Sequence, residues 1–202
     1  NLESLSNLGF ICTQIQDFQN ALIYLEKASK VAPERDDIGL QIAQIKTHFG
    51  QYDEAKGILK PFLDSEPLSQ NSYLMMAQLE LLTNNSAGAK SNLEQLLKKD
   101  PNLVEAMINL ASILETEGKA EDAHNYLTQA AQKAPFHFQA NLELGRFLGQ
   151  NGQAEEGLTY LKKAVQIQPG DWGIHVHLGN TYQEIGDFDN TIKSYKKALS
   201  IN

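Results

Sequence analysis

The sequence is poor in cysteine. Its single cysteine, Cys12, excludes a disulfide within the chain and any metal site built from several cysteines. Such cysteine usage fits a reducing compartment and also an envelope protein without disulfides, so we favour the cytoplasm only slightly over the periplasm. The first residues of the chain also lack the charged and apolar blocks of a secretory signal.

Long apolar runs are missing as well. No stretch approaches the roughly 20 apolar residues that a helix needs to cross a bilayer, so we expect a soluble protein without direct membrane insertion. Basic residues are few, since 17 Lys and Arg stand against 25 Asp and Glu, for a net charge of −8. Because Lys and Arg supply most of the affinity for phosphate, this balance argues against nucleic acid as a ligand.

The sequence signatures of enzymes are absent too. The histidines form no His-Glu-x-x-His pair, so we expect no metal site, and no Gly-x-x-x-x-Gly-Lys-Ser/Thr loop is present to hold phosphate. No nucleophile, base and oxyanion donors fall into a recognisable catalytic pattern. We therefore predict that the chain is not an enzyme and that it uses no metal ion and no cofactor.

What the sequence does have is a period of 34 residues. Five of its six prolines follow this spacing, and Pro61 alone lies off it. The five are Pro33, Pro67, Pro101, Pro135 and Pro169. They divide the chain without gaps into six repeats, which are residues 2–35, 36–69, 70–103, 104–137, 138–171 and 172–202. We predict a single array of these repeats and, because the chain does not begin with Met, a fragment of a longer protein.

The same period holds at other positions of the repeat, numbered from 1 to 34. Position 7 is aliphatic or Met throughout: Leu8, Ile42, Met76, Leu110, Leu144 and Leu178. Position 8 is small throughout: Gly9, Ala43, Ala77, Ala111, Gly145 and Gly179. Position 15 holds Gln16, Gly50, Asn84, Gly118, Gly152 and Gly186, which indicates a left-handed residue at the end of a helix. Apolar residues recur at helical spacing on both sides, so each repeat is predicted to fold as helix, tight turn, helix.

In period and in the order of these columns, the sequence resembles the tetratricopeptide repeat. The best single match is "VHLGNTYQEIGDFDNTIKSYKKALSIN", from Val176 to Asn202, and the resemblance covers the whole chain. It implies an all-α fold, a right-handed superhelical solenoid of tandem helix–turn–helix repeats with a concave face. It also implies that the first helix of each repeat lines that face with positions 2, 5, 6, 9, 12, 13 and 16.

Position 5 is aliphatic in five consecutive repeats, and two interpretations are open. The stripe either packs between first helices or forms an apolar groove for the side chains of a partner. For the groove we predict the partner-binding residues Leu40, Gln44, His48, Leu74, Met75, Gln78, Leu81, Leu82, Ile108, Asn109, Leu142 and Arg146. The aliphatic residues would anchor the partner, and the amides of Gln44, Gln78 and Asn109 would bond its backbone.

Charged residues on the same columns are mostly acidic. The acids are Glu3, Asp17, Asp37, Glu105, Glu115, Glu143, Glu184 and Asp187, whereas the bases are Lys119 and Arg146. A concave surface focuses such a field, which favours a neutral or basic protein or peptide as the partner. Alternatively, these side chains are the solvated surface of an acidic protein.

One well-known ligand of the family is not expected. Tetratricopeptide domains that hold the acidic tails of heat-shock chaperones use a carboxylate clamp of Lys, Asn and Arg at set positions. The first window of this chain offers Ser6, Phe10, Gln41, Asn71 and Met75 there instead, and no later window matches. We therefore predict no tight binding to those tails.

These patterns together predict a scaffold that binds a protein or peptide in its concave groove. The alternative is a non-catalytic arm of a larger enzyme, such as a glycosyl- or sulfotransferase, or of an envelope polysaccharide-export or assembly machine. The last predicted helix carries Ile192, Tyr195, Leu199 and Ile201 with nothing after it to cover them. We predict that further helices cover them or that the chain self-associates through this helix.

Overall fold

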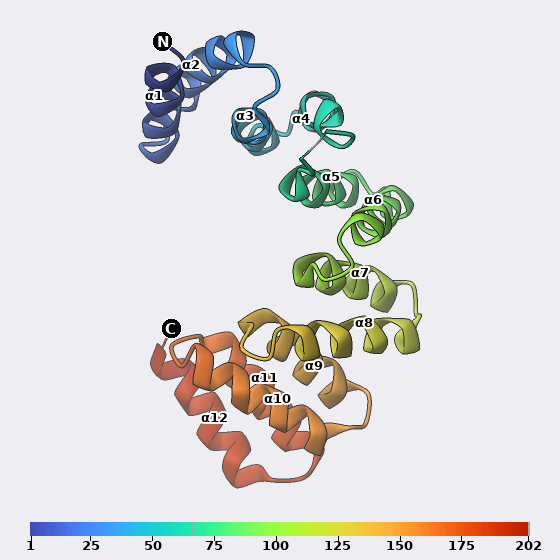
Figure 1. Cartoon of the computed structure of the whole chain (residues 1–202). Coiled ribbons are helices and arrows are strands. Elements are labelled where there is room, and N and C mark those ends of the chain that lie inside the picture. The colour runs from blue at the N-terminus through green and yellow to red at the C-terminus, as the bar shows by residue number, and fades with distance from the viewer. Residues whose placement is uncertain (66, 202) are drawn as a thin grey trace. The chain divides into compact units, whose positions relative to one another are not determined.

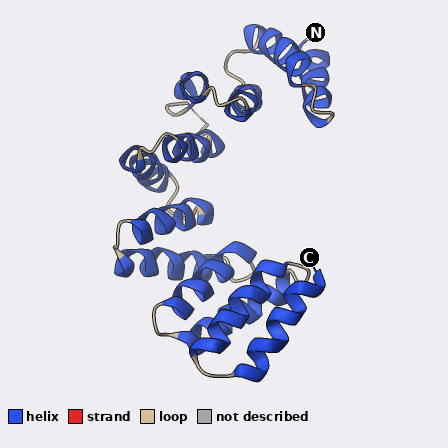
Figure 2. Cartoon of the chain, turned by 180° about the vertical axis from the view of Figure 1, so that it is seen from behind, coloured by secondary structure: helices blue, strands red, loops and turns tan. Residues whose placement is uncertain are grey.

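The computed structural model describes residues 1–65 and 67–201. Over these residues the chain has twelve α-helices, one short 3-10 helix and no strand (Figures 1 and 2). The predicted all-α fold of helix–turn–helix repeats is therefore confirmed. Among the same residues, none of the helices combines the length and the apolar character that a membrane crossing demands.

The first helix of every repeat occupies the same 13 positions. These helices are α1 (Leu2–Gln14), α3 (Asp36–His48), α5 (Gln70–Leu82), α7 (Val104–Thr116), α9 (Phe138–Gln150) and α11 (Trp172–Glu184). The first helices thus begin and end at intervals of 34 residues, the period of the sequence.

The second helices occupy positions 17 to 30 in five repeats. They are α2 (Phe18–Val31), α6 (Ser86–Lys99), α8 (Ala120–Lys133), α10 (Ala154–Ile167) and α12 (Phe188–Ile201). The exception is α4 (Tyr52–Leu59), which has eight residues and runs into the 3-10 helix η1 (Lys60–Phe62). Pro61 lies within η1, and a proline has no N–H for the helical hydrogen bond and crowds the preceding turn. The proline off the 34-residue spacing therefore explains the short helix.

The shortened helix brings Phe62 into the core of its repeat. The Phe62 side chain is only 7% exposed, and its ring lies against Gly39 where a Cβ on that residue would be. Gly39 is position 4 of its repeat, and position 4 of the next repeat holds the buried Tyr73. Phe62 thus supplies from the second helix the aromatic volume that Gly39 leaves open on the first.

The turn between the two helices of each repeat contains a residue with positive φ at position 15. Four are glycines, with φ between 71° and 80°, and the other two are Gln16 at 62° and Asn84 at 58°. Glycine adopts this conformation freely, whereas a residue with a Cβ pays about 1–2 kcal/mol for it. The prediction of a left-handed residue at this position is confirmed in all six repeats.

Small residues at positions 8 and 20 let the two helices of a repeat cross closely. Between α9 and α10 both residues are glycine, and a Cβ on Gly157 would lie 2.7 Å from the carbonyl oxygen of Gly145. The two backbones therefore touch, and no side chain fits between them. Ala43 and Ala55 take these positions between α3 and α4, where both are fully buried.

Contacts divide the chain into two compact units, unit 1 (Asn1–Lys99) and unit 2 (Asp100–Asn202), which hold three helix pairs each. In unit 1, one apolar cluster links α1, α2 and α3, and a second links α3, α4 and α5. In unit 2, a cluster links α9, α10 and α11. Each helix pair thus buries its apolar side against the next pair, as in a solenoid. That both units form one continuous array stays a prediction.

Candidate functional site

The candidate site is the first-helix surface, defined as positions 2, 5, 6, 9, 12, 13 and 16 of the repeats. In unit 1 this surface is mostly polar but carries a group of aliphatic side chains from α3 and α5. Leu40 on α3 and Met75 on α5 pack against one shared cluster that includes Ala43 and Leu79. Leu40, Met75 and the neighbouring Leu74 are all half-buried. They support packing between the first helices and still show part of their surface to solvent.

Other predicted residues of unit 1 are open to solvent. Leu81 and Leu82 at the end of α5 are each 45% exposed. Gln44 and Gln78 are exposed, and their amides form no hydrogen bond within the described part of the chain. Exposed aliphatic side chains beside unused amide donors and acceptors are suited to an extended peptide, which offers both side chains and a polar backbone.

His48 differs from the other predicted residues because aromatic rings surround it. Its ring centroid lies 4.6 Å from that of Phe18 and 5.3 Å from that of Phe49. The Phe18 and Phe49 rings meet edge to face at 5.9 Å. His48 is therefore one member of a surface aromatic cluster at the turn side of α3.

In unit 2 the first-helix surface is polar and is organised by Arg146 on α9. Its guanidinium donates from Nη2 to Glu115 on α7 at 2.6 Å, from Nε to Glu143 at 2.7 Å, and from Nη1 to Gln150 at 2.7 Å. Glu143 also accepts a hydrogen bond of 2.8 Å from Gln139. This network joins the surfaces of α7 and α9 and holds a net charge of −1 from two carboxylates and one guanidinium.

Two hollows flank this network. One, of about 290 Å³, lies between α7 and α9 and is lined by Ile108, Asn109, Ser112, Glu115, Leu127, Gln139, Glu143 and Arg146. The other, of about 340 Å³, lies between α9 and α11 and is lined by Arg146, Gly149, Gln150, His177, Asn180, Thr181, Gln183 and Glu184. Polar groups from three successive first helices thus line hollows on one surface.

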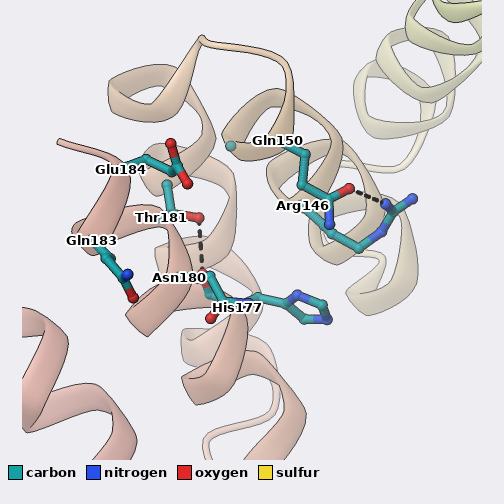
Figure 3. A pocket seen from close by; sticks show the side chains of 8 residues that line it. Arg146, Gln150, His177, Asn180, Thr181, Gln183 and Glu184 are labelled. Carbon is teal, nitrogen blue, oxygen red and sulfur yellow. Dashed lines mark hydrogen bonds between the residues drawn. The ribbon is translucent and has the colours of Figure 1, made fainter.

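Figure 3 shows how the second hollow is built. Arg146 and Gln150 are hydrogen-bonded to each other on α9, and the His177 ring extends from α11. Gly149 lets α11 approach, because a Cβ there would lie 2.6 Å from the Thr181 hydroxyl oxygen. The Thr181 hydroxyl donates its hydrogen to the carbonyl of His177, so towards a ligand its oxygen can only accept.

The electrostatics of this region keep His177 neutral to lower pH. Burial and then the positive charge of Arg146 lower the pKa of His177 below its ordinary value, and Glu143 and Asp171 act in the opposite direction. Burial also opposes the charge of Arg146, but its hydrogen bonds to Glu143 and Glu115 hold the pKa of Arg146 above the usual range. At neutral pH the surface therefore presents a neutral imidazole beside a fully paired guanidinium.

Two predicted anchors in unit 2 need correction. Ile108 is 8% exposed and Leu142 is 9% exposed, and Leu142 belongs to the apolar cluster of α9, α10 and α11. Both are core residues, because neighbouring helices cover them. Asn109, beside Ile108, is exposed, and its amide forms no hydrogen bond among the described residues. Arg146 is half-buried and paired with two carboxylates, and its contact with a partner stays a prediction.

The residues that the sequence did not single out are the polar lining of the hollows. Ser112, Gln139, Gln150, His177 and Asn180 fall on positions 2, 6, 9 and 13 of the first helices. The signal was present, because positions 6, 9 and 13 are polar throughout repeats 4 to 6. No group of three or more side chains able to hold a metal ion occurs among the residues that the structure describes.

Models of known families match most of the chain. Two tetratricopeptide repeat models match residues 16–79 and 173–202. The model of the TT21 fifth ARM repeats domain matches residues 70–174, just over half of the chain. No curated protein sequence matches the chain closely enough to count as a relative.

Solved structures share the fold. A crystal structure of MamA matches with a TM-score of 0.67 and 22% identity, over 79% of this chain and 94% of that one. YrrB, described as a TPR protein with an unusual peptide-binding site, matches with a TM-score of 0.64 and 17% identity, over 88% of this chain and 92% of that one. Identities this low establish a common fold and nothing further.

Proposed function

Because the chain belongs to the tetratricopeptide repeat family, with its central half matching the TT21 fifth ARM repeats domain, we propose that it is a scaffold that binds another protein. The observation that carries the proposal is the first-helix surface. Helix α5 places the exposed Leu81 and Leu82 on this surface, and α3 and α5 add half-buried aliphatic side chains and the unpaired amides of Gln44 and Gln78, none of which a folded chain needs to leave open. YrrB shows that this fold can carry a peptide-binding site.

In unit 1, an extended peptide would lay its apolar side chains on Leu74, Met75, Leu81 and Leu82. These residues come from α5, and Leu40 on α3 continues the surface. The amides of Gln44 and Gln78 would take the hydrogen bonds of the peptide backbone. Fully burying one exposed aliphatic side chain contributes about 1.5–3 kcal/mol, so several anchors together with backbone hydrogen bonds are needed to offset the cost of association.

The charge of the surface favours a neutral or basic partner. In unit 2 the cation of Arg146 is already paired with two carboxylates, so it has little attraction left for an acid. Glu184 lines the hollow between α9 and α11 without a hydrogen bond among the described residues. An acidic peptide would therefore bring its carboxylates against uncompensated negative charge.

Selection of peptides on the purified chain, followed by titration of the best binder, tests the proposal. The variant Leu81→Glu/Leu82→Glu introduces two charges on the proposed surface, and we expect at least tenfold weaker binding, about 1.4 kcal/mol. The matched control is Ile23→Glu/Val31→Glu on α2, where the original side chains are 47% and 63% exposed. The control should keep its affinity, and circular dichroism should show both variants folded.

Two results would overturn the proposed surface. One is that no peptide binds the chain with micromolar affinity. The other is that the α2 control loses as much affinity as the α5 variant, because binding would then not depend on the first helices. If the α5 double variant does not fold, its loss of affinity is not informative. The milder variant Leu82→Ser, which removes one anchor without adding charge, then tests the surface.

Other predictions on function stay predictions. Tetratricopeptide repeats are generally non-catalytic scaffolds, in keeping with the expectation that the chain is not an enzyme. An arm of a larger transferase or export machine is the alternative function, and no residue of this chain favours it over the scaffold. Self-association through α12 concerns a surface other than the first-helix surface.

A further inference from the structure

The hollow between α9 and α11 contains side-chain amides whose orientation is fixed by hydrogen bonds. Its volume is about 340 Å³, and its lining includes the exposed residues Gln150, Asn180 and Gln183. The oxygen of the Gln150 amide accepts a hydrogen bond of 2.7 Å from Nη1 of Arg146 (Figure 3). Because a guanidinium can only donate, the nitrogen of this amide is the end that remains for a ligand.

Tyr195 on α12 orients a second amide of this hollow. Its hydroxyl donates to Oδ1 of Asn180 over 2.6 Å and lies 3.4 Å from Oε1 of Gln183. The tyrosine ring packs against Gly179, where a Cβ would lie 2.5 Å from ring atom Cε1. The Asn180 amide therefore also keeps its nitrogen, with two N–H groups, for a ligand.

The same hollow contains a carboxylate that can accept a hydrogen bond. Glu184 on α11 lines the hollow and accepts no hydrogen bond from any described residue. N–H donors from α9 and α11 thus share the hollow with one acceptor. A ligand that satisfies both needs an oxygen for the N–H groups and an N–H group for the carboxylate.

The groups around the hollow disfavour charged and apolar ligands. An acid would meet the carboxylate of Glu184, whereas Arg146 is already paired with two carboxylates. A base would meet N–H groups and the charge of Arg146, which after burial is the second cause of the lowered pKa of His177. An apolar side chain would take water from the amides and leave them unpaired. The matching ligand is therefore neutral and carries both an acceptor and a donor.

We propose that this hollow is a subsite for the carboxamide side chain of a glutamine or asparagine in the bound peptide. The carboxamide oxygen accepts from the amides of Gln150 and Asn180, and the carboxamide NH₂ group donates to Glu184. Tyr195 is a positioning residue, because it acts through Asn180. The inference rests on the proposed function, since it names a residue of the peptide that the first-helix surface is proposed to bind.

Small model compounds test the subsite without a selected peptide. The N-acetyl methylamides of glutamine, glutamate and methionine share one backbone and differ at the end of the side chain. Each compound is titrated into the ¹⁵N-labelled chain, and NMR follows the side-chain NH₂ signals of Gln150 and Asn180. We expect the glutamine derivative to shift these signals and to bind about three- to tenfold more tightly than the other two, the effect of one net hydrogen bond.

Two variants assign the preference to named groups. Tyr195→Phe keeps the ring and removes the hydroxyl, so the Asn180 amide is free to turn, and the preference for glutamine over glutamate should fall about threefold. A purely structural role of the hydroxyl would lower thermal stability and leave the preference unchanged. Glu184→Gln removes the carboxylate and should likewise reduce the discrimination against glutamate. The control is Gln166→Ala, which removes an exposed amide on α10 outside the hollow and should change neither quantity.

Three results would overturn the inference. Equal binding of the three derivatives would mean that their common backbone makes the contact, tighter binding of the glutamate derivative would mean an anion site, and no shift at the solubility limit would mean no subsite. The proposed function fails separately, because its test measures peptide binding at Leu81 and Leu82. A chain that binds a selected peptide there without a preference for glutamine refutes the subsite alone. A chain that binds no peptide and still prefers the glutamine derivative refutes the peptide scaffold alone.

Discussion

Units 1 and 2 follow one repeat pattern, but their first-helix surfaces differ in chemical character. In unit 1, Pro61 shortens α4, and the first-helix surface is apolar around Leu81 and Leu82. In unit 2 all six helices keep the full length of the pattern, and the surface is a hydrogen-bonded network around Arg146. The columns that pack helices are alike in both units, whereas positions 6, 9, 12 and 13 differ. The repeat thus fixes the backbone and leaves the recognition surface free to vary.

The largest expected effect concerns the close helix crossing of unit 2. Gly157→Ala should lower the free energy of unfolding by about 1–3 kcal/mol, because the new methyl would overlap the backbone of α9 at Gly145. Urea denaturation measures the change, and hydrogen exchange locates it in α9 and α10. The matched change in unit 1 is Gly57→Ala on α4, where a Cβ meets no atom within 4 Å. Gly57→Ala should raise the free energy of unfolding by up to about 1 kcal/mol. A change of the same sign in both variants would contradict the comparison.

The Arg146 network should come next. Arg146→Met leaves Glu115 and Glu143, 22% and 23% exposed, facing each other without a cation. We expect a loss of about 1–2 kcal/mol, between the values of exposed and buried pairs. In unit 1, Lys46→Met removes the partner of Glu54, whose side chain is 55% exposed, and should cost less than about 1 kcal/mol. Thermal unfolding of both variants compares the two pairs, and a larger loss for Lys46→Met would show that the network of unit 2 adds nothing.

The turns differ between the units as well. Unit 2 has glycine at all three left-handed positions, whereas unit 1 has Gln16 and Asn84 at two of them. Gln16→Gly should therefore stabilise the chain by about 1 kcal/mol by relieving its positive φ. The reverse change in unit 2, Gly118→Gln, should destabilise it by a similar amount. Urea denaturation checks both, and a destabilising Gln16→Gly would mean that the side chain makes a compensating contact.

The smallest expected effect is a dependence on pH that belongs to unit 2. Burial and the charge of Arg146 lower the pKa of His177, so the unfolded chain binds a proton here at a pH where the folded chain does not. Stability should therefore fall as the pH drops through about 6.5, the ordinary histidine pKa, towards the lower folded value. His177→Gln should reduce this slope in thermal unfolding, whereas Gln183→Ala in the same hollow should leave it unchanged. If stability changes equally with pH in the wild type and in His177→Gln, the pH dependence does not come from His177.

Most of the fold could be predicted from the sequence because its determinants are local. The period of apolar residues sets the helices, and the residues at position 15 set the turns at Gly50, Gly118, Gly152 and Gly186. The short α4 could have been expected from Pro61, which is the proline off the 34-residue spacing. The contact of Phe62 with Gly39 could not have been expected from the sequence. It joins two segments and depends on the direction that the chain takes after α4 ends.

The candidate site was less predictable than the fold. Helical periodicity places Leu40, Leu81, Ile108 and Leu142 near the first-helix surface but does not fix their burial. Neighbouring helices decide it, and they cover Ile108 and Leu142 while leaving Leu81 open. The carboxylate partners of Arg146 were likewise hidden among the acids of the chain, because an ion pair between adjacent repeats depends on the packing of α7 against α9.

The recurrence of helix boundaries every 34 residues has a genetic consequence. A block of this length, cut anywhere and rejoined, brings together a helix start and a helix end that already fit each other. Unequal crossing-over can therefore add or remove whole hairpins while the reading frame and the junctions survive. Point mutation then needs to change only the outward-facing positions of a new copy, so that a lineage of such chains can alter its length and its ligand in separate steps.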